Sequence, residues 1–249
     1  MPAVAAYLRI ANELRGRIID EDIAPGGKLP SETEIMAEYR VSRMVAKYAI
    51  NVLKGEGLVV GRRGSGVYVR EVRRIMRQSH GRDMRTQSGP TSPFARDLSL
   101  AGMRAEWEHH SEHTTASADV ARRLGIEPGA AVMHTRYRFL ADGTPVQVSN
   151  SWEPLEITGG TAVEWPEDCG VSGVVARMDS IGIHIDDCSE KVAARSAHPR
   201  EIEALDLSMR GAYVMTIQRV YRAGSRPIET ADIVVPGDRY EIMYSFPID

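Results

Sequence analysis

The strongest constraint in this sequence is a change of period within its first 70 or so residues. Up to Gly57, apolar residues recur at steps of three and four, the spacing of helices that bury one face. Over residues 58–69 the spacing changes to two, the period of β-strands, on both sides of a basic, glycine-rich tip. Three helices followed by a hairpin in so short a segment indicate a winged helix-turn-helix.

Capping residues delimit these helices. The first is expected over residues 7–18 and ends before a Pro-Gly-Gly turn. Ser31, followed three residues later by Glu34, forms a capping-box pattern, which predicts a second helix over residues 32–39. Ser42 is placed to cap a third helix, which two glycines end just before the hairpin.

Length and charge divide the chain further. Its 249 residues favour two domains. Residues 1–88 contain 16 Lys and Arg against 10 Asp and Glu, a balance of +6, whereas residues 89–249 hold the other 15 and 24, a balance of −9. A basic N-terminal part and an acidic remainder suggest that only the first part meets a polyanion.

The segment after the hairpin is rich in arginine and then in small polar residues and proline. It has little to bury, so we expect a DNA-binding domain over residues 1–74, a linker over 75–92 and a second domain over 93–249. A helix in the first half of this segment, or its packing on either domain, is the alternative.

The second domain alternates between helix and strand patterns. Hairpin turns at residues 142–145 and 224–227 join successive strands, which predicts an α+β domain with a mainly antiparallel sheet and helices on one side. Helices are expected over residues 94–101, 118–124, 170–182 and 199–205, and strands over 132–140, 146–152, 212–222, 228–235 and 240–246.

Motifs in both halves carry a family resemblance. The first half contains Leu29-Pro30-Ser31-Glu32, Val41-Ser42-Arg43, Gly57-Leu58 and Gly64-Ser65-Gly66-Val67-Tyr68-Val69. The second contains Arg136-Tyr137-Arg138, Ala141-Asp142-Gly143-Thr144-Pro145, Arg226-Pro227-Ile228-Glu229 and Gly237-Asp238-Arg239-Tyr240. Together they resemble the GntR regulators of the HutC branch. The resemblance implies a winged helix-turn-helix, a chorismate lyase-like UTRA domain, and a cytoplasmic homodimer that represses transcription from an inverted-repeat DNA operator until a small effector releases it.

The third helix is the expected recognition helix. Arg43 and Lys47 stand four residues apart and share one face, and an arginine at a helix start can bond both acceptors of a guanine. The wing suits phosphate or minor-groove contact. The expected DNA-binding residues are Ser31, Ser42, Arg43, Met44, Lys47, Arg62, Arg63 and Gly64. Thr33 and Val45 depart from the family pattern, so the operator is expected to differ.

Effector binding is expected in the second domain. Arg136 and Arg138 alternate along a strand and so face one side, where two guanidiniums can hold a phosphate or carboxylate. With family positions added, the expected effector-binding residues are Thr91, Ser92, Arg136, Arg138, Ser172 and Glu229. The structural alternative is that both arginines pair with Glu229 or Asp232. Ser149, Val235 and Pro236 depart from the family pattern, which leaves room for a less polar ligand.

Other function classes have less support. The histidines at 109, 110 and 113 lie in a strand-like pattern without a suitably spaced partner, so we expect no metal and no cofactor. Cys169 and Cys188 are expected as free thiols. Nothing resembles a secretion signal or a membrane span. A constitutive repressor without ligand, and a chorismate lyase-like enzyme without a visible acid–base pair, are the alternatives.

Overall fold

The computed structural model describes residues 5–79, 92–207 and 212–246. The chain divides into two compact units, Met1–Arg73 with Leu207–Ala212 and Arg74–Asp206 with Tyr213–Asp249. We call them the N-terminal and the C-terminal unit, and each is described by itself. Within the described residues, no helix combines the length and the apolar character that a membrane crossing requires.

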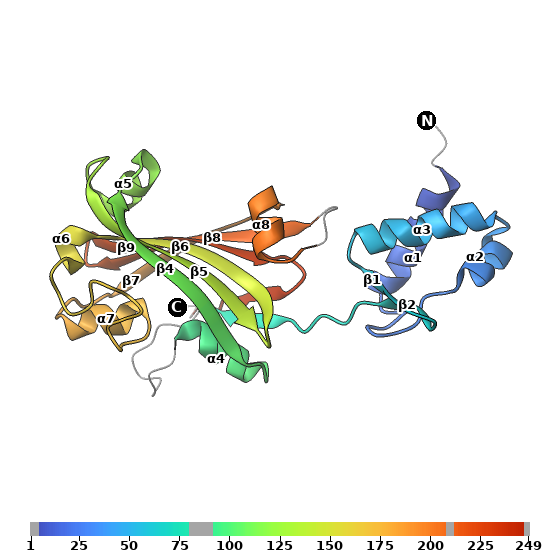
Figure 1. Cartoon of the computed structure of the whole chain (residues 1–249), viewed down its shortest axis with the longest axis horizontal. Coiled ribbons are helices and arrows are strands. Elements are labelled where there is room, and N and C mark those ends of the chain that lie inside the picture. The colour runs from blue at the N-terminus through green and yellow to red at the C-terminus, as the bar shows by residue number, and fades with distance from the viewer. Residues whose placement is uncertain (1–4, 80–91, 208–211, 247–249) are drawn as a thin grey trace. The chain divides into compact units, whose positions relative to one another are not determined.

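The N-terminal unit has the predicted order of three helices and a hairpin (Figure 1). Its elements are α1 (Ala6–Ile19), α2 (Glu32–Tyr39), α3 (Arg43–Gly55), β1 (Val59–Arg62) and β2 (Gly66–Val69), and the two strands pair antiparallel. The apolar stripes meet in one core, in which Ile10, Leu14, Ile35 and Leu53 are fully buried. The predicted winged helix-turn-helix is therefore confirmed.

Side-chain caps fix where α2 and α3 begin. The Ser31 hydroxyl accepts a hydrogen bond from the Glu34 amide at 3.2 Å, and the Glu34 carboxylate accepts one from the Ser31 amide at 2.8 Å. The bond from the Ser31 amide, with a second that the Ser31 hydroxyl donates to the same carboxylate at 2.7 Å, stabilises the charged form and lowers the pKa of Glu34. The Ser42 hydroxyl accepts from the Val45 amide in the same way. Both predicted caps are present, and they fix the first residues of α2 and α3.

The C-terminal unit is built on a six-stranded sheet in which every neighbouring pair is antiparallel. The strand order is β4-β5-β6-β9-β8-β7. The strands are β4 (Ala105–Thr115), β5 (Ala131–Ala141), β6 (Thr144–Pro154), β7 (Asp187–Ser196), β8 (Tyr213–Ala223) and β9 (Arg226–Pro236). The predicted hairpins β5–β6 and β8–β9 lie at its centre, and the antiparallel α+β class is confirmed.

Helices lie on both faces of this sheet, not on one side as expected (Figure 1). The helices α4 (Pro93–Leu100) and α7 (Val174–Ser180) cover one face, and α5 (Ala118–Leu124) and α8 (Pro199–Ala204) lie on the other. The short α6 (Leu155–Thr158) follows β6. The strand period places residues on alternate faces but does not say which helices return to which face, so the one-sided arrangement was wrong.

Two further elements differ from the sequence prediction. Residues 75–78, expected as linker or helix, form β3 (Ile75–Gln78), which pairs in parallel with β10 (Tyr240–Met243) and belongs to the C-terminal unit. The helix expected over 170–182 is only α7, because Gly173 has a φ of 88° and cannot be part of a right-handed helix. The rest of the expected linker, residues 80–91, lies outside the described residues.

Candidate DNA interface and ligand cavity

The two faces of α3 differ completely in exposure. Ala46, Ala49 and Leu53 are fully buried on one face. The other face presents Arg43, whose side chain is 80% exposed, together with Met44 at 58%. Ser42, Lys47 and Tyr48 are also exposed. The predicted residues of the recognition helix thus form one continuous free surface. Sequence analysis missed Tyr48, although its position four residues after Met44 places it on this surface.

Arg43 is exposed but already has a partner within its own unit. Its Nε donates to the Glu32 carboxylate at 2.8 Å, and this hydrogen bond and ion pair raise the pKa of Arg43. An exposed pair of this kind contributes little to stability, because solvent and salt screen the two charges. Glu32 therefore orients the guanidinium at the start of α3 and can release it readily to another acceptor.

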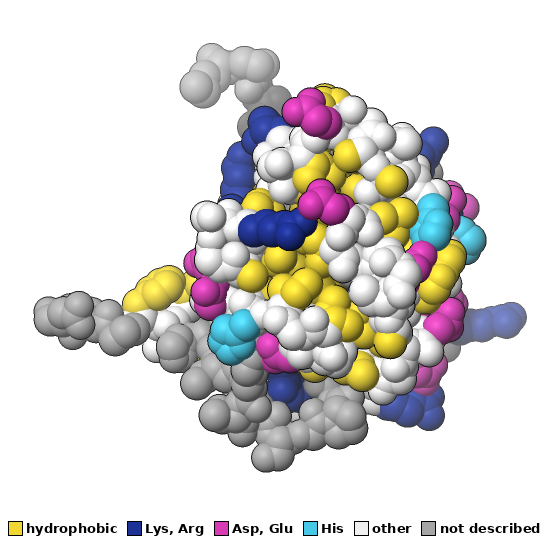
Figure 2. Space-filling view, turned by 90° about the vertical axis from the view of Figure 1, so that its left-hand side faces the viewer, with side chains coloured by type: hydrophobic (Ala, Val, Ile, Leu, Met, Phe, Trp, Pro, Cys, Tyr) yellow, Lys and Arg dark blue, Asp and Glu magenta, His cyan; other side chains and the backbone are white. Residues whose placement is uncertain are grey.

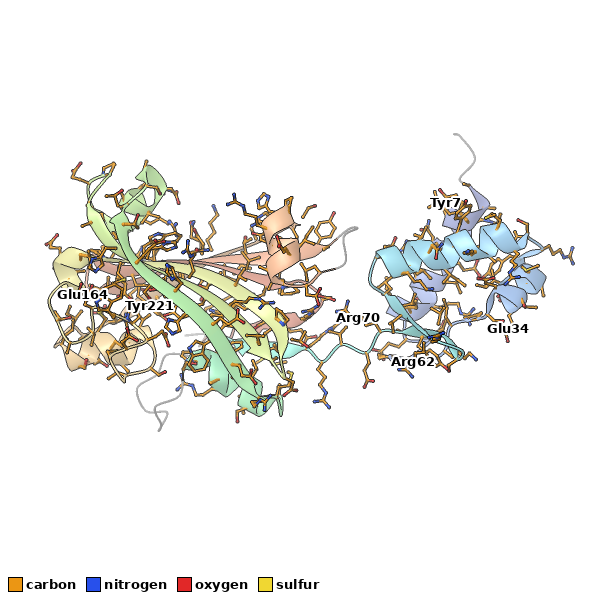
Figure 3. The ribbon with its side chains drawn as sticks, viewed as in Figure 1. Tyr7, Glu34, Arg62, Arg70, Glu164 and Tyr221 are labelled. Atoms are coloured by element: carbon orange, nitrogen blue, oxygen red, sulfur yellow. The ribbon has the colours of Figure 1, made fainter. Side chains whose placement is uncertain are left out.

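The wing hairpin carries the remaining candidate DNA contacts. The Arg62 guanidinium lies 4.3 Å from the centre of the Tyr68 ring, a cation–π contact that holds it beside β2 (Figure 3). Arg63 is exposed at the tip, followed by Gly64 with a φ of 73°. Tyr68 also hydrogen-bonds the Ser65 hydroxyl at 2.6 Å. The wing therefore presents one oriented and one free guanidinium beside a backbone without side-chain bulk.

Ser31 and Ser42 lie at the N-terminal ends of α2 and α3, where helix dipoles favour an anion such as a phosphate. Both hydroxyls act as caps in this structure, and both residues are exposed. Their location fits the expected contact with a nucleic-acid backbone, while their own hydrogen bonds explain why these residue types are needed for folding.

The C-terminal unit contains a cavity of about 440 Å³ between one face of the sheet and helices α4 and α7. Of the expected effector-binding residues, Ser92, Ser172 and Glu229 line this cavity. The Ser92 hydroxyl also caps α4 by accepting from the Ala95 amide at 3.2 Å. Thr91 lies outside the described residues. The structure thus brings together three predicted residues from segments far apart in the sequence.

Arg136 and Arg138 do not line this cavity. As predicted, the two arginines share one face of β5. Tyr137 and Phe139, which alternate with them along the strand, line the cavity, so the arginines lie on the face of the sheet away from it. Arg136 pairs with Glu112 across the sheet at 3.4 Å. The expectation that the two arginines join Ser92, Ser172 and Glu229 in one pocket is therefore corrected.

Arg138 has structural partners on that opposite face. Its Nε donates to the carbonyl of Ala204 at the end of α8 at 2.8 Å, and its Nη1 pairs with Glu108 at 3.2 Å. The structural alternative for the arginines is thus realised, but with partners on β4 and α8 rather than with Glu229 or Asp232. A more open hollow on this face, with a volume of about 870 Å³, includes Arg136 and Arg138 among its lining residues.

The cavity's own arginines come from elements that sequence analysis did not single out. Arg77 of β3 forms an ion pair with Glu190 of β7, Arg177 of α7 with Glu153 of β6, and Arg219 with Glu229 at 3.0 Å across the β8–β9 hairpin. Arg77 and Arg177 are almost completely buried. Isolated arginines in strands and helices carry no motif, so only the fold reveals that they converge.

Glu153 is a buried carboxyl of the cavity with a raised pKa. It is 3% exposed, and its Oε1 accepts from Arg177, while its Oε2 has no hydrogen-bond partner among the described residues. Burial, the main cause, raises the pKa of Glu153 to about 7, with Glu229 acting in the same direction and Arg177 opposing them. A buried oxygen without a donor is costly, so this atom is a natural contact point for a bound molecule.

Aromatic side chains form another wall of the cavity. The rings of Tyr137 and Phe139 stack with centroids 5.3 Å apart, and Phe94 lies 4.6 Å from Phe139. The Tyr137 hydroxyl and the Trp107 indole both donate to Glu167, at 2.8 and 3.0 Å. Burial, followed by the negative charge of Glu167, raises the pKa of Tyr137. This wall offers flat apolar surface with its polar tips already bonded.

The histidines of β4 do not assemble into a metal centre in the described part of the chain. No group of three or more His, Cys, Asp or Glu side chains has a metal-binding arrangement there. His113 instead pairs with Glu164 at 2.8 Å and stacks on Trp165. Figure 2 faces the end of the C-terminal unit that carries α5, α6 and α7, where Lys and Arg side chains are scattered among Asp and Glu around a band of hydrophobic side chains.

Together, a winged helix-turn-helix with a free basic face and an α+β unit with an internal cavity define the class of two-domain transcriptional regulators. Family models match both parts: bacterial regulatory proteins of the gntR family over residues 6–69, and the UTRA domain over residues 101–241. The chain therefore belongs to the gntR family and carries a UTRA domain, which confirms the resemblance indicated by its motifs.

Relatives align over nearly the whole chain. The transcriptional repressor NagR of Bacillus subtilis is 27% identical over 97% of this chain and 94% of its own length. The histidine utilization repressor of Pseudomonas putida is 23% identical over 95% of this chain and 90% of its own length. These relatives are transcriptional regulators rather than enzymes.

Solved structures agree on the fold. A crystal structure of a GntR-family transcriptional regulator is 43% identical, covers 98% of both chains and superposes with a TM-score of 0.69. PhnF from Mycobacterium smegmatis shares the fold at 21% identity, with a TM-score of 0.60 over 96% of this chain and 100% of its own.

Proposed function

We propose that this regulator is a repressor that binds an inverted-repeat operator as a homodimer and is released when a small molecule enters the cavity of the C-terminal unit. The α3 face, the wing and the helix starts at Ser31 and Ser42 contact DNA. The relatives named as repressors support the direction of regulation.

The free face of α3 is the observation that carries DNA binding. Arg43, Met44 and Lys47 are exposed on it, whereas the residues on its other side form the core of the unit. A helix that buries one face and exposes a basic face at its N-terminal half matches the way a recognition helix enters the major groove. One such unit makes few base contacts, which supports a two-fold dimer.

The first test is Arg43→Ala in a DNA-binding assay on fragments of the regulator's own genome. Loss of a bidentate contact with guanine costs about 1–3 kcal/mol for each half-site, so affinity should fall by roughly ten- to a hundredfold or more. Arg104→Ala is the matched control, since Arg104 is an exposed arginine of the C-terminal unit that pairs with the nearby Glu106. Equal affinities of Arg43→Ala and the control would contradict the assignment of α3.

Ligand control is supported by the cavity and by where β3 lies in the chain. The first segment of the N-terminal unit ends at Arg73, and β3 begins two residues later. Arg77 of β3 lines the cavity. A molecule that changes the pairing of Arg77 with Glu190 acts on the strand that leads directly to the DNA-binding unit. A ligand shifts DNA affinity only by its different affinity for the two states of the dimer.

The chemical class of the ligand needs revision. The expectation of an anionic effector depended on Arg136 and Arg138, and these arginines face away from the cavity and pair with Glu112 and Glu108. The cavity residues themselves must therefore indicate the class.

A further inference from the structure

We propose that the cavity of the C-terminal unit selects a ligand without phosphate or carboxylate groups, one that places an N–H donor against Glu153 and a flat ring against the aromatic wall. This inference rests on the proposed function, because it names the class of molecule that the regulator senses. A protonated amine next to an aromatic ring is the simplest compound of this class.

The first support is the balance of charge. Four arginines and four carboxylates line the cavity: Arg77, Arg96, Arg177 and Arg219, with Glu153, Glu167, Asp179 and Glu229. Glu190, the partner of Arg77, adds a further carboxylate beside them. A pocket that binds a phosphate or carboxylate usually has more cationic than anionic side chains, whereas in this cavity the two numbers are equal.

The second support is that three of the four cavity arginines already form ion pairs. Arg77, Arg177 and Arg219 each form an ion pair with a glutamate of the sheet. An anion bound to any of these three guanidiniums would lie close to the glutamate paired with it, whose negative charge repels the anion. A cation or a neutral donor meets no such repulsion.

The third support is the free oxygen of Glu153. Its Oε2 is buried, lacks a hydrogen-bond partner among the described residues and belongs to a side chain that lines the cavity. Carboxylate oxygens accept hydrogen bonds from N–H groups, and a charged donor gives the stronger bond. A ligand N–H group at this position satisfies an atom that the protein leaves unsatisfied.

The aromatic wall supplies the rest of the selection. Tyr137 and Phe139 present stacked rings, and Trp107 lines the same cavity. The Tyr137 hydroxyl and the Trp107 indole N–H are bonded to Glu167, so these rings offer apolar surface and no further donors. Flat rings pack well on such surface, and aromatic faces also attract a cation. A cavity of about 440 Å³ has room for a compound of this size.

The test uses the full-length protein and pairs of compounds that share a ring but differ in charge. Tryptamine is compared with indole-3-acetate, phenethylamine with phenylpropanoate, and histamine with imidazole-4-acetate, each by thermal shift, with inorganic phosphate as a further anion. We expect amines at millimolar concentration to raise the Tm by roughly 2 °C or more, and their carboxylate counterparts to leave it unchanged.

A substitution then tests the contact itself. In Glu153→Gln, Arg177 loses its carboxylate partner, so we expect the response to amines to disappear and a response to the carboxylates to emerge. Glu108→Gln is the control, because Glu108 is an exposed glutamate paired with Arg138 on the opposite face of the sheet. That variant should respond like the unchanged protein. If Glu153→Gln does not fold, the comparison of amines with carboxylates on the unchanged protein still decides the class.

The outcomes separate the ligand class from the proposed function. A Tm increase with the carboxylates or with phosphate, or none with any of the amines, overturns the inference about the class. DNA release is measured with the same compounds. If a carboxylate releases DNA, ligand control stands and the class is wrong. If an amine binds without changing DNA affinity, the class stands and ligand control by this cavity fails.

Discussion

At the scale of single residues, partners decide what each charged side chain does. Arg136 and Arg43 are both exposed arginines with one glutamate partner each. Arg43 stands at the start of a helix whose face is free, so its guanidinium can change partners. Arg136 lies on a strand and faces away from the cavity, and its pair with Glu112 links β5 to β4. The sequence predicted a DNA contact for Arg43 and an effector contact for Arg136, and the fold leaves Arg43 on an exposed helix face but places Arg136 outside the cavity.

A residue-scale prediction concerns Glu153 and pH. Burial raises its pKa from 4.5 to about 7 in the folded chain, so between these values the folded state holds a proton that the unfolded state has lost. The free energy of unfolding therefore falls as pH rises through this window, and the effect is complete above it. We expect the Tm of the unchanged protein to decrease between pH 5 and pH 8 relative to that of Glu153→Gln. A relative increase would mean that the pKa of Glu153 is not raised.

At the scale of elements, the sequence predicted the bounds of a helix where the residues that fix those bounds lie within the same segment. Ser31 with Glu34 and Ser42 delimit α2 and α3, because caps satisfy backbone groups within a few residues. β7 and β3 were missed for opposite reasons. β7 is an edge strand whose residues are nearly all exposed, so it lacks apolar alternation. β3 buries an arginine, Arg77, which in sequence looks like solvent-exposed charge.

The wing gives an element-scale prediction. Gly66 has a φ of 128°, a backbone conformation that residues with a side chain rarely adopt. Gly66→Ala should therefore destabilise the N-terminal unit by about 1–3 kcal/mol, measured by thermal or denaturant unfolding. Gly64→Asn is the control, since Gly64 has open space around it and asparagine tolerates its left-handed φ of 73°. Equal stability of the two variants would show that the β2 backbone is not constrained at Gly66.

A second prediction at this scale concerns β3. Arg77→Ala removes an ion-pair partner of Glu190, whose side chain is only 11% exposed, so the carboxylate loses this guanidinium where solvent cannot replace it. Breaking a buried pair in this way costs about 3–5 kcal/mol. We expect a lower Tm for the C-terminal unit and a changed response of DNA binding to ligand. Arg74→Ala is the control, because Arg74 precedes the same strand but is exposed and pairs with exposed Glu241. If ligand response were unchanged in a folded Arg77→Ala protein, β3 would not carry the signal.

At the scale of the whole molecule, the charge asymmetry of the chain leads to a prediction about DNA binding. The basic balance lies in residues 1–88 and the acidic one in the remainder. Binding through Arg43, Lys47, Arg62 and Arg63 should weaken steeply with salt, and Arg63→Ala should reduce the slope of log affinity against log salt by roughly one per half-site. The measurement is a salt titration of operator binding, in which Arg104→Ala should keep the original slope. An unchanged slope for Arg63→Ala would remove the wing from the interface.

The sequence by itself determined the order of the elements, the caps, the two central hairpins and the family, because these depend on periods, turns and motifs within a few residues of one another. The tertiary structure alone decided which face of β5 meets the cavity, and which distant side chains join there. An alternating strand is symmetric between its two faces until a helix packs on one of them. Here α4 and α7 cover the face with Tyr137 and Phe139, so the cavity receives Glu153, Arg177 and Arg219 instead of Arg136 and Arg138.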